Sequence, residues 1–260
     1  MEGADLVVAG IAAGHMPQVV FVHAERALEL YARLGLSGEG RPAGTAPPAV
    51  YPVAERVAGK ISTLERPPDV MAVFPLPAPR PLTMLSGMSG ARGDDAAARG
   101  PGGDLLLVYA DGIGDPGNMG TLLRAAVAFG ATALATAPGS TDLFGPKTVR
   151  AGMGAVFGLP LFPESPLADV LAALPGIAVY GLAAHDGASL ASADPRRPAV
   201  LVVGAERPGL SDEARALVTQ LVTIPLTPAR PGWVESLNAG VAGAIALYEF
   251  SRRTAARAKG

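Results

Sequence analysis

The stretch DLLLVYADGIGDPGNMGTLLRAAVAFGATALATA, residues 104–137, decides the fold class of this chain. The apolar run at 104–110 predicts a buried strand, and a glycine-rich turn follows it. The spacing of apolar residues over 119–130 then predicts a helix, and a second apolar run at 131–137 predicts another strand. Strand, helix and strand in this order indicate a parallel sheet covered by helices.

The same alternation continues toward the end of the chain. Further strands are predicted at 159–162, 177–184, 198–204 and 221–226. Helices are predicted at 145–157 and at 232–250, where Gly, Ala and Val fill the packing face of the last helix. We therefore expect an α/β domain over residues 104–260, with a parallel sheet and helices on both faces.

A smaller α/β domain is predicted before it, over residues 1–78. Its expected strands are 18–23, 47–53 and 69–76, and its expected helices are 25–36 and 54–62. Residues 79–103 have few large apolar side chains and many Gly, Pro, Ala and charged residues, which predicts a linker between the two domains.

Composition excludes several classes of function. The 260 residues include no cysteine, which excludes disulfides, a thiolate nucleophile and a cysteine-ligated metal. The three histidines, His15, His23 and His185, are far apart in the sequence, so we expect no metal site. The net charge of −2 limits any nucleic-acid surface to a local basic patch. No apolar run reaches transmembrane length, and we expect a soluble, cytoplasmic protein with no membrane partner.

One glycine pattern favours a dinucleotide site, but its context does not. Gly112, Gly114 and Gly117 match G-x-G-x-x-G between a predicted strand and a predicted helix. Pro116 lies inside the match and removes a backbone N–H that a pyrophosphate would need. The strand at 131–137 ends without the acidic residue that holds a ribose, because Asp142 comes too late. A nucleotide-dependent oxidoreductase is thus the weaker interpretation.

Three motifs together point elsewhere. They are DPGNMGTLLRAA at 115–126, LVVGAERPGLS at 201–211 and IPLTPARPGWVESLNAGVAGAIALYE at 224–249. In this order and spacing they resemble the signatures of the SpoU-type, TrmH-like RNA 2′-O-ribose methyltransferases of the SPOUT superfamily. The residues that carry the match are Asn118, Gly120, Arg124, Gly204, Glu206, Gly209, Ile224, Pro225, Ser236, Leu237 and Asn238. The loop between the two halves of the third motif is longer here than is usual for the family.

The resemblance implies a fold, a reaction and partners. It implies a deep C-terminal trefoil knot, a homodimer, and a small N-terminal domain similar to ribosomal protein L30 that binds the RNA substrate. It implies S-adenosyl-L-methionine as the methyl donor and a ribose 2′-hydroxyl as the acceptor, with 23S rRNA as the first expectation. The alternatives are a tRNA substrate or a non-catalytic RNA-binding or cofactor-sensing protein.

The resemblance also implies site residues. Catalytic roles fall to Arg124, Asn118, Glu206, Ser236 and Asn238. Cofactor contacts fall to Gly204, Ile224, Leu226, Leu237 and Asn238. RNA contacts are expected from Arg124, Lys147, Arg150 and Arg230. A guanidinium stays protonated, so we favour Arg124 as a phosphate-binding group whose charge lowers the pKa of the ribose hydroxyl.

The same residues also have purely structural interpretations. Ser236 is also a good N-cap for the last helix, and Asn118 is a good cap for the helix that follows it. Glu206 is equally suited to a loop ion pair with Arg207. Lys147 and Arg150, three residues apart on one helix face, also suit an ordinary solvated surface.

Overall fold

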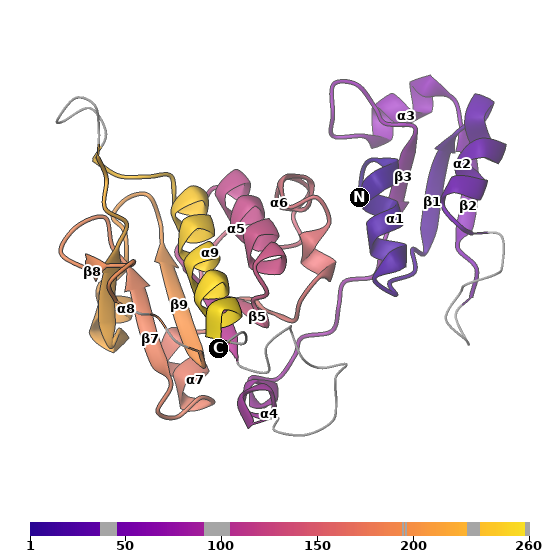
Figure 1. The fold of residues 1–260 in the computed structure, drawn as a ribbon. Helices are drawn as coiled ribbons and strands as arrows, with labels where there is room; N and C mark the ends of the chain where they lie inside the picture. The colour runs from indigo at the N-terminus through magenta and orange to yellow at the C-terminus, as the bar shows by residue number, and fades with distance from the viewer. Residues whose placement is uncertain (37–45, 91–104, 194, 196, 228–234, 258–260) are drawn as a thin grey trace. The chain divides into compact units, whose positions relative to one another are not determined.

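The computed structural model describes residues 1–36, 46–90, 105–193, 195, 197–227 and 235–257. The chain divides into two compact units, Met1–Ala78 and Pro79–Gly260 (Figure 1). Within the described residues, no helix combines the length and the apolar character that a membrane crossing requires.

The first unit is a small α/β structure. Its sheet has the order β2-β1-β3, with β1 parallel to β2 and antiparallel to β3. The strands are β1 (Val19–His23), β2 (Ala49–Val53) and β3 (Val70–Val73). The helices are α1 (Ala4–Ala12), the 3-10 turn η1 (Ala24–Arg26), α2 (Ala27–Arg33) and α3 (Glu55–Ile61). Every predicted element is present with shorter bounds, and α1 was missed.

The core of this unit lies on one face of its sheet. Val20 and Val22 alternate inward along β1 and are buried against Val7 of α1 and Leu30 of α2. Alternate side chains of the strand therefore face the sheet's covered side and pack against the apolar faces of both helices.

The second unit contains the predicted parallel sheet, and all of its strand pairs are parallel. Its seven strands have the order β6-β5-β4-β9-β7-β10-β8. They are β4 (Leu106–Asp111), β5 (Ala133–Thr136), β6 (Leu161–Phe162), β7 (Ala178–Leu182), β8 (Ala188–Ser189), β9 (Ala199–Gly204) and β10 (Gln220–Thr223). The central strands β4 and β9 are buried along their whole length, which explains their continuous apolar runs.

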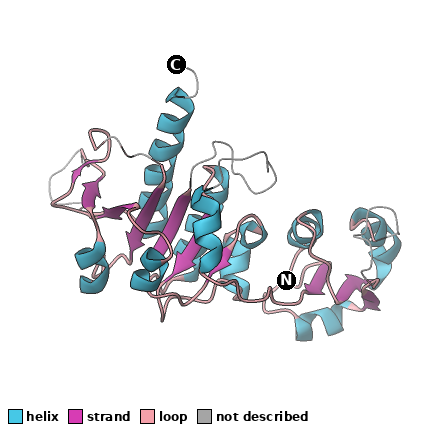
Figure 2. Ribbon diagram, turned by 90° about the horizontal axis from the view of Figure 1, so that it is seen from below, coloured by secondary structure: helices cyan, strands magenta, loops and turns pink. Residues whose placement is uncertain are grey.

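Helices cover both faces of this sheet, as predicted (Figure 2). One face packs against α7 (Leu167–Ala172) and α8 (Asp212–Leu217). The opposite face packs against α5 (Pro116–Ala128) and α9 (Ala239–Arg257), which lie side by side. The short helix α6 (Pro146–Ala151) and the 3-10 turn η3 (Ala155–Phe157) pack against α5.

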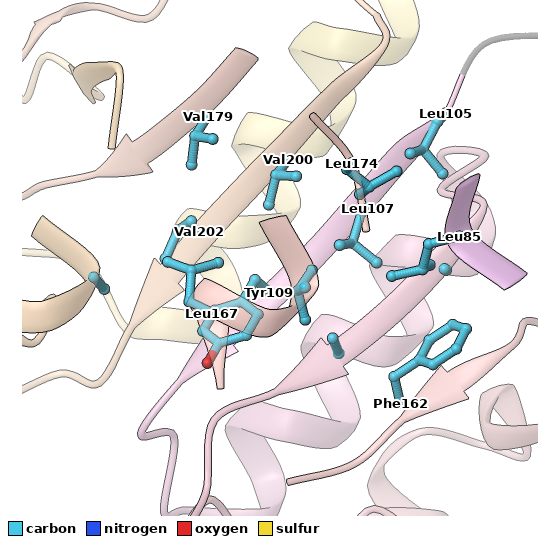
Figure 3. Close-up of a cluster of buried hydrophobic side chains, with 14 of the residues drawn as sticks. Leu85, Leu105, Leu107, Tyr109, Phe162, Leu167, Leu174, Val179, Val200 and Val202 are labelled. Carbon is cyan, nitrogen blue, oxygen red and sulfur yellow. The ribbon is translucent and has the colours of Figure 1, made fainter. Parts of the chain in front are cut away.

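One hydrophobic core of the second unit includes a helix from the segment predicted as a linker. Leu107, Tyr109 and Val202 point from the sheet into a cluster of buried side chains (Figure 3). Leu85 of α4 (Thr83–Gly90) is fully buried in the same cluster. The first part of the segment 79–103 thus belongs to the packed second unit, while residues 91–103 lie outside the described residues.

Two helix predictions need correction. The predicted helix at 145–157 is interrupted, because Met153 and Gly154 have φ values of 50° and 80° and end the helical run. The last helix was predicted over 232–250 but spans Ala239–Arg257, so it begins and ends seven residues later.

Candidate active site

Two loops begin at neighbouring strand ends and carry the first two motifs. Asp111 ends β4, Gly204 ends β9, and the two residues are paired in the sheet. The carboxyl ends of parallel strands are where open α/β sheets bind ligands. A Cβ built on Gly204 would lie 2.4 Å from the carbonyl carbon of Gly209, so only glycine lets the second loop fold back onto its own strand.

The first loop delivers Asn118 through a helix cap. The Asp115 carboxylate accepts from the backbone N–H of Asn118 at 2.8 Å, and Pro116 occupies the first helical position of α5. Asp115 is therefore the N-cap, and the alternative interpretation of Asn118 as a cap is wrong. The Asn118 side chain is left available for contacts outside its own helix.

Three polar side chains from the three motifs meet at this point. The Asn118 Nδ2 donates to the Glu206 Oε1 at 3.0 Å. The Asn238 Nδ2 donates to the same Glu206 oxygen at 2.7 Å and to the Asn118 Oδ1 at 2.6 Å. In these three residues, the Asn–Glu–Asn cluster, Glu206 and Asn238 are exposed and Asn118 is half-buried, and they are 32 to 120 positions apart in sequence. Glu206 bonds to the two asparagines rather than serving mainly as a partner for Arg207.

Asn238 has a second task at the start of the last helix. Its Oδ1 accepts from the backbone N–H of Val241 at 3.1 Å, which satisfies a donor of the first turn of α9. The N-cap interpretation of Ser236 is therefore wrong, because Ser236 precedes the helix by three residues.

Small residues bring α9 against α5. A Cβ on Gly240 would lie 2.9 Å from the carbonyl oxygen of Asn118, and a Cβ on Gly243 would lie 2.4 Å from the Leu122 Cδ1. Gly240 and Gly243 thus allow close packing of two helices within one chain, which brings Asn238 within hydrogen-bond distance of Asn118.

Two hollows adjoin the cluster. The first, the inner cavity, measures about 240 Å³ and lies beneath the loops that follow β7 and β9. Its wall includes six of the predicted residues: Gly204, Glu206, Ile224, Leu226, Ser236 and Leu237. The second, the outer cleft, is lined by Asn118, Asn238 and residues 112–115. Glu206, Ser236 and Leu237 line both hollows.

The inner cavity fits a ligand with an apolar part and a charged part. Leu182, Ile224 and Leu226 contribute apolar surface. His185, Asp186 and Arg215 place ionisable side chains on the same wall. These three were missed from the sequence, although two of them follow directly after a predicted strand, which is the usual place for ligand contacts in such sheets.

The outer cleft also contains residues that were missed. Ile113 and Asp115 line it from the first loop, and Arg207 lines it from the second. Arg207 adds a positive charge to a cleft whose Glu206 is negative. Its signal in the sequence was its position one residue after Glu206 in the second motif.

The structure does not bring every predicted residue to this site. Arg124 is on the exposed side of α5, six residues after Asn118, and is thus about 120° away from it around the helix. Lys147 and Arg150 lie on α6 and line neither of the two hollows. Arg230 lies outside the described residues. Over the described ranges, no group of three or more His, Asp or Glu side chains is placed to hold a metal ion.

Comparison with known proteins agrees with this geometry. The model of the SpoU rRNA Methylase family matches residues 105–248. A 23S rRNA (uridine(2479)-2'-O)-methyltransferase of Streptomyces viridochromogenes is 32% identical over 196 residues, which are 73% of this chain and 62% of that protein. A 23S rRNA (guanosine-2'-O-)-methyltransferase RlmB of Xanthomonas axonopodis pv. citri is 36% identical over 153 residues, 58% of this chain and 60% of that protein. The matched regions thus span about three fifths of these relatives.

Solved structures extend the similarity beyond the matched motifs. The SpoU methyltransferase AviRb from Streptomyces viridochromogenes, in complex with AdoMet, superposes with a TM-score of 0.74 at 25% identity, covering 100% of this chain and 90% of that one. An AdoMet-bound rRNA methyltransferase from Sinorhizobium meliloti gives 0.72 at 27% identity, covering 97% and 86%. The chain belongs to the SpoU rRNA methylase family.

Proposed function

We propose that this protein transfers a methyl group from S-adenosyl-L-methionine to a ribose 2′-hydroxyl of 23S rRNA. The observation that carries the proposal is the Asn–Glu–Asn cluster, which unites the three family motifs between an inner cavity and an outer cleft. A group-transfer enzyme needs its two substrates on adjoining surfaces, and the cluster lies between two such hollows. Two of the most similar relatives carry names for this reaction on 23S rRNA.

The inner cavity is the proposed site of the cofactor. S-adenosyl-L-methionine supplies a methyl group on a positively charged sulfonium when it is bound. Ile224, Leu226 and Leu237 would cover its apolar part, and Gly204 would let it approach the end of β9 closely. Glu206 would place a carboxylate near its positive charge.

The outer cleft is the proposed site of the ribose. Asn118 and Asn238 offer both donors and acceptors there, and Arg207 offers a positive charge for the RNA backbone. Ser236 lines both hollows and would contact ribose or cofactor through its hydroxyl. Because these groups are held by one another, they would fix the direction of the 2′-hydroxyl without reorganisation.

In this proposal, Arg124 acts at the active site of a second subunit. Val241, Ile245 and Tyr248 of α9 are 45%, 39% and 53% exposed and form an apolar stripe on the side of α9 away from the sheet. Val127, 38% exposed, shares the exposed side of α5 with Arg124. We propose that a second copy covers this surface in a homodimer, so that each Arg124 serves the cluster of its partner.

Mixing two inactive variants tests this arrangement. If Arg124 acts across the dimer, combining Arg124→Ala with Glu206→Ala subunits should restore about one quarter of the sites, since half of the dimers are mixed and one of their two sites is intact. An Ile245→Asp control, which should sediment as a monomer, should prevent the recovery. No recovery between variants that form mixed dimers would place Arg124 in its own subunit's site.

The rest of the fold would bring RNA to the site. Residues on both sides of the third motif's loop, Ile224 and Leu226 before it and Ser236 and Leu237 after it, line the same cavity as the loop 205–210. We propose that the chain passes through a trefoil knot there. Lys147, Arg150 and Arg230 would bind RNA phosphates, and the first unit would act as an L30-like substrate-binding domain. A ribosomal RNA substrate implies action in the cytoplasm.

The test is transfer of labelled methyl groups to RNA from a strain that lacks the gene. Ribosomal RNA and tRNA should be assayed separately, with wild type, Glu206→Ala, and Glu213→Ala as the matched control. Glu213 is an exposed acid in the first turn of α8. We expect labelled 23S rRNA with wild type and the control, and at least a hundredfold less with Glu206→Ala. Label only in tRNA would show that tRNA, not 23S rRNA, is the substrate. Label in neither pool, despite cofactor binding, would indicate a non-catalytic protein.

A further inference from the structure

A buried carboxylate lies behind the Asn–Glu–Asn cluster. Asp111 is the last residue of β4 and is only 5% exposed. Its carboxylate accepts from the backbone N–H of Ser211 at 2.6 Å and from the Ser211 hydroxyl at 3.1 Å. Burial of a carboxylate is unfavourable unless such donors compensate it, so this contact fixes both partners firmly.

Ser211 is the point where the second loop ends. Its hydroxyl also accepts from the backbone N–H of Ala214 at 3.1 Å, which makes Ser211 the N-cap of α8. The loop 205–210, which carries Glu206, therefore runs between two fixed points. One is Gly204, paired with Asp111 in the sheet, and the other is Ser211, bonded to the Asp111 side chain.

A single residue thus joins both functional loops. Asp111 leads directly into residues 112–115 of the outer cleft and, through its side chain, closes the loop 205–210. Glu206 bonds to Asn118 across these two loops at 3.0 Å. A small displacement of either loop weakens this bond, because the donor and acceptor atoms of a good hydrogen bond lie within about 3.2 Å of each other.

We propose that Asp111 is a positioning residue for the transfer reaction, holding the loop 205–210 so that Glu206 stays bonded to Asn118. The inference rests on the proposed methyl transfer for its catalytic consequence. The structural part, that Asp111 orders the loop, stands independently of any activity.

A double-mutant cycle tests the catalytic part. Asp111→Ala should lower the rate of methyl transfer about tenfold to a hundredfold, as expected for a misplaced catalytic group. If it acts through Glu206, the same change in a Glu206→Ala background should lower the residual rate less than threefold. Asp111→Asn should recover most of the activity, since its amide oxygen still accepts from Ser211. Equal effects of Asp111→Ala in both backgrounds would overturn the proposal.

A matched control separates positioning from general destabilisation. Asp142 also accepts a backbone N–H, from Phe144 at 2.8 Å, in a different loop of the same unit. Asp142→Ala should leave the rate within twofold of wild type. A loss with Asp142→Ala as large as that with Asp111→Ala would mean that any removal of such a bond reduces activity, which contradicts a specific role.

Hydrogen–deuterium exchange tests the structural part without any RNA. The amides that report on this contact are those of Ser211, which donates to Asp111, and Ala214, which donates to the Ser211 hydroxyl. Asp111→Ala should speed their exchange at least tenfold, while Asp111→Asn and Asp142→Ala leave them protected. Unchanged protection of these two amides in Asp111→Ala would refute the inference. If wild type transfers no methyl group, the proposed function fails, and the exchange experiment still decides whether Asp111 orders the loop.

Discussion

Replacing Gly120 by alanine should force α6 away from α5. A Cβ at this position would lie 2.5 Å from the Ala151 Cβ, 2.7 Å from the Gly152 nitrogen and 2.8 Å from the Ala151 carbonyl carbon. Non-bonded carbon atoms in good contact are about 3.5–4.0 Å apart, so the helices must separate by about 1 Å. Two of the three atoms belong to the backbone, and no rotation of a side chain removes the overlap.

The cost can be estimated from these contacts. Overpacking of this kind costs about 1–3 kcal/mol, and the better helix propensity of alanine returns up to about 1 kcal/mol. We expect Gly120→Ala to lower the free energy of unfolding by about 1–2 kcal/mol, measured by urea denaturation followed by circular dichroism. Its functional consequence should be weaker RNA binding, because α6 carries Lys147 and Arg150.

A second glycine provides the control for this prediction. Gly87 lies in α4 of the same unit, and a Cβ there would meet nothing within 4 Å. Gly87→Ala should raise the free energy of unfolding by about 0.5–1 kcal/mol, through helix propensity alone. If Gly120→Ala is as stable as Gly87→Ala, α5 and α6 are not in the tight contact that the argument requires.

Three further predictions concern the last helix and the cavity. Hydrogen bonds from Arg252 and Arg253 lower the pKa of Glu249 to about 2. The stability that Glu249 contributes is present above its ordinary pKa of 4.5 and is lost as the pH falls toward 2. The difference in the free energy of unfolding between wild type and Glu249→Gln should therefore shrink over this range of pH, and a constant difference would refute the assignment. Asn238→Ala should lower the free energy of unfolding by about 1 kcal/mol, measured by thermal unfolding, because the helix cap is lost, and it should also reduce methyl transfer. A variant with unchanged stability and unchanged activity would contradict both roles. Gly204→Ala should weaken S-adenosyl-L-methionine binding at least tenfold in calorimetry, because the new Cβ meets the Gly209 backbone at 2.4 Å, and unchanged affinity would refute this.

The sequence predicts the sheet well because its signal is local. The central strands β4 and β9 are buried on both sides, and each is a continuous apolar run that no helix period explains. The residues of the cluster are predictable only through the resemblance. Asn118 and Asn238 are 120 positions apart, and neither has a local pattern that indicates the other.

The errors arise where side-chain contacts decide a boundary. The start of α9 depends on Asn238 rather than on the apolar run before it, and the start of α5 depends on Asp115. The helix α4 was missed because Gly87 and two serines interrupt its apolar pattern, and its burial depends on Leu85 reaching the core of the second unit. Such tertiary contacts are not visible in a window of neighbouring residues.

The composition of α9 follows from the position of the cluster. A glycine inside a helix costs about 1 kcal/mol relative to alanine, so a helix with Gly240 and Gly243 gives up intrinsic stability. A Cβ at Gly240 would lie 2.9 Å from the Asn118 carbonyl oxygen, and relieving that contact requires α9 to move back by several tenths of an ångström. The Asn238 Nδ2, now 2.6 Å from the Asn118 Oδ1 and 2.7 Å from the Glu206 Oε1, would then approach the limit of a good hydrogen bond with both. The small residues of the last helix therefore let the third motif lie against the first two. They lower the intrinsic stability of the helix, and in return they allow the hydrogen bonds of the Asn–Glu–Asn cluster to form.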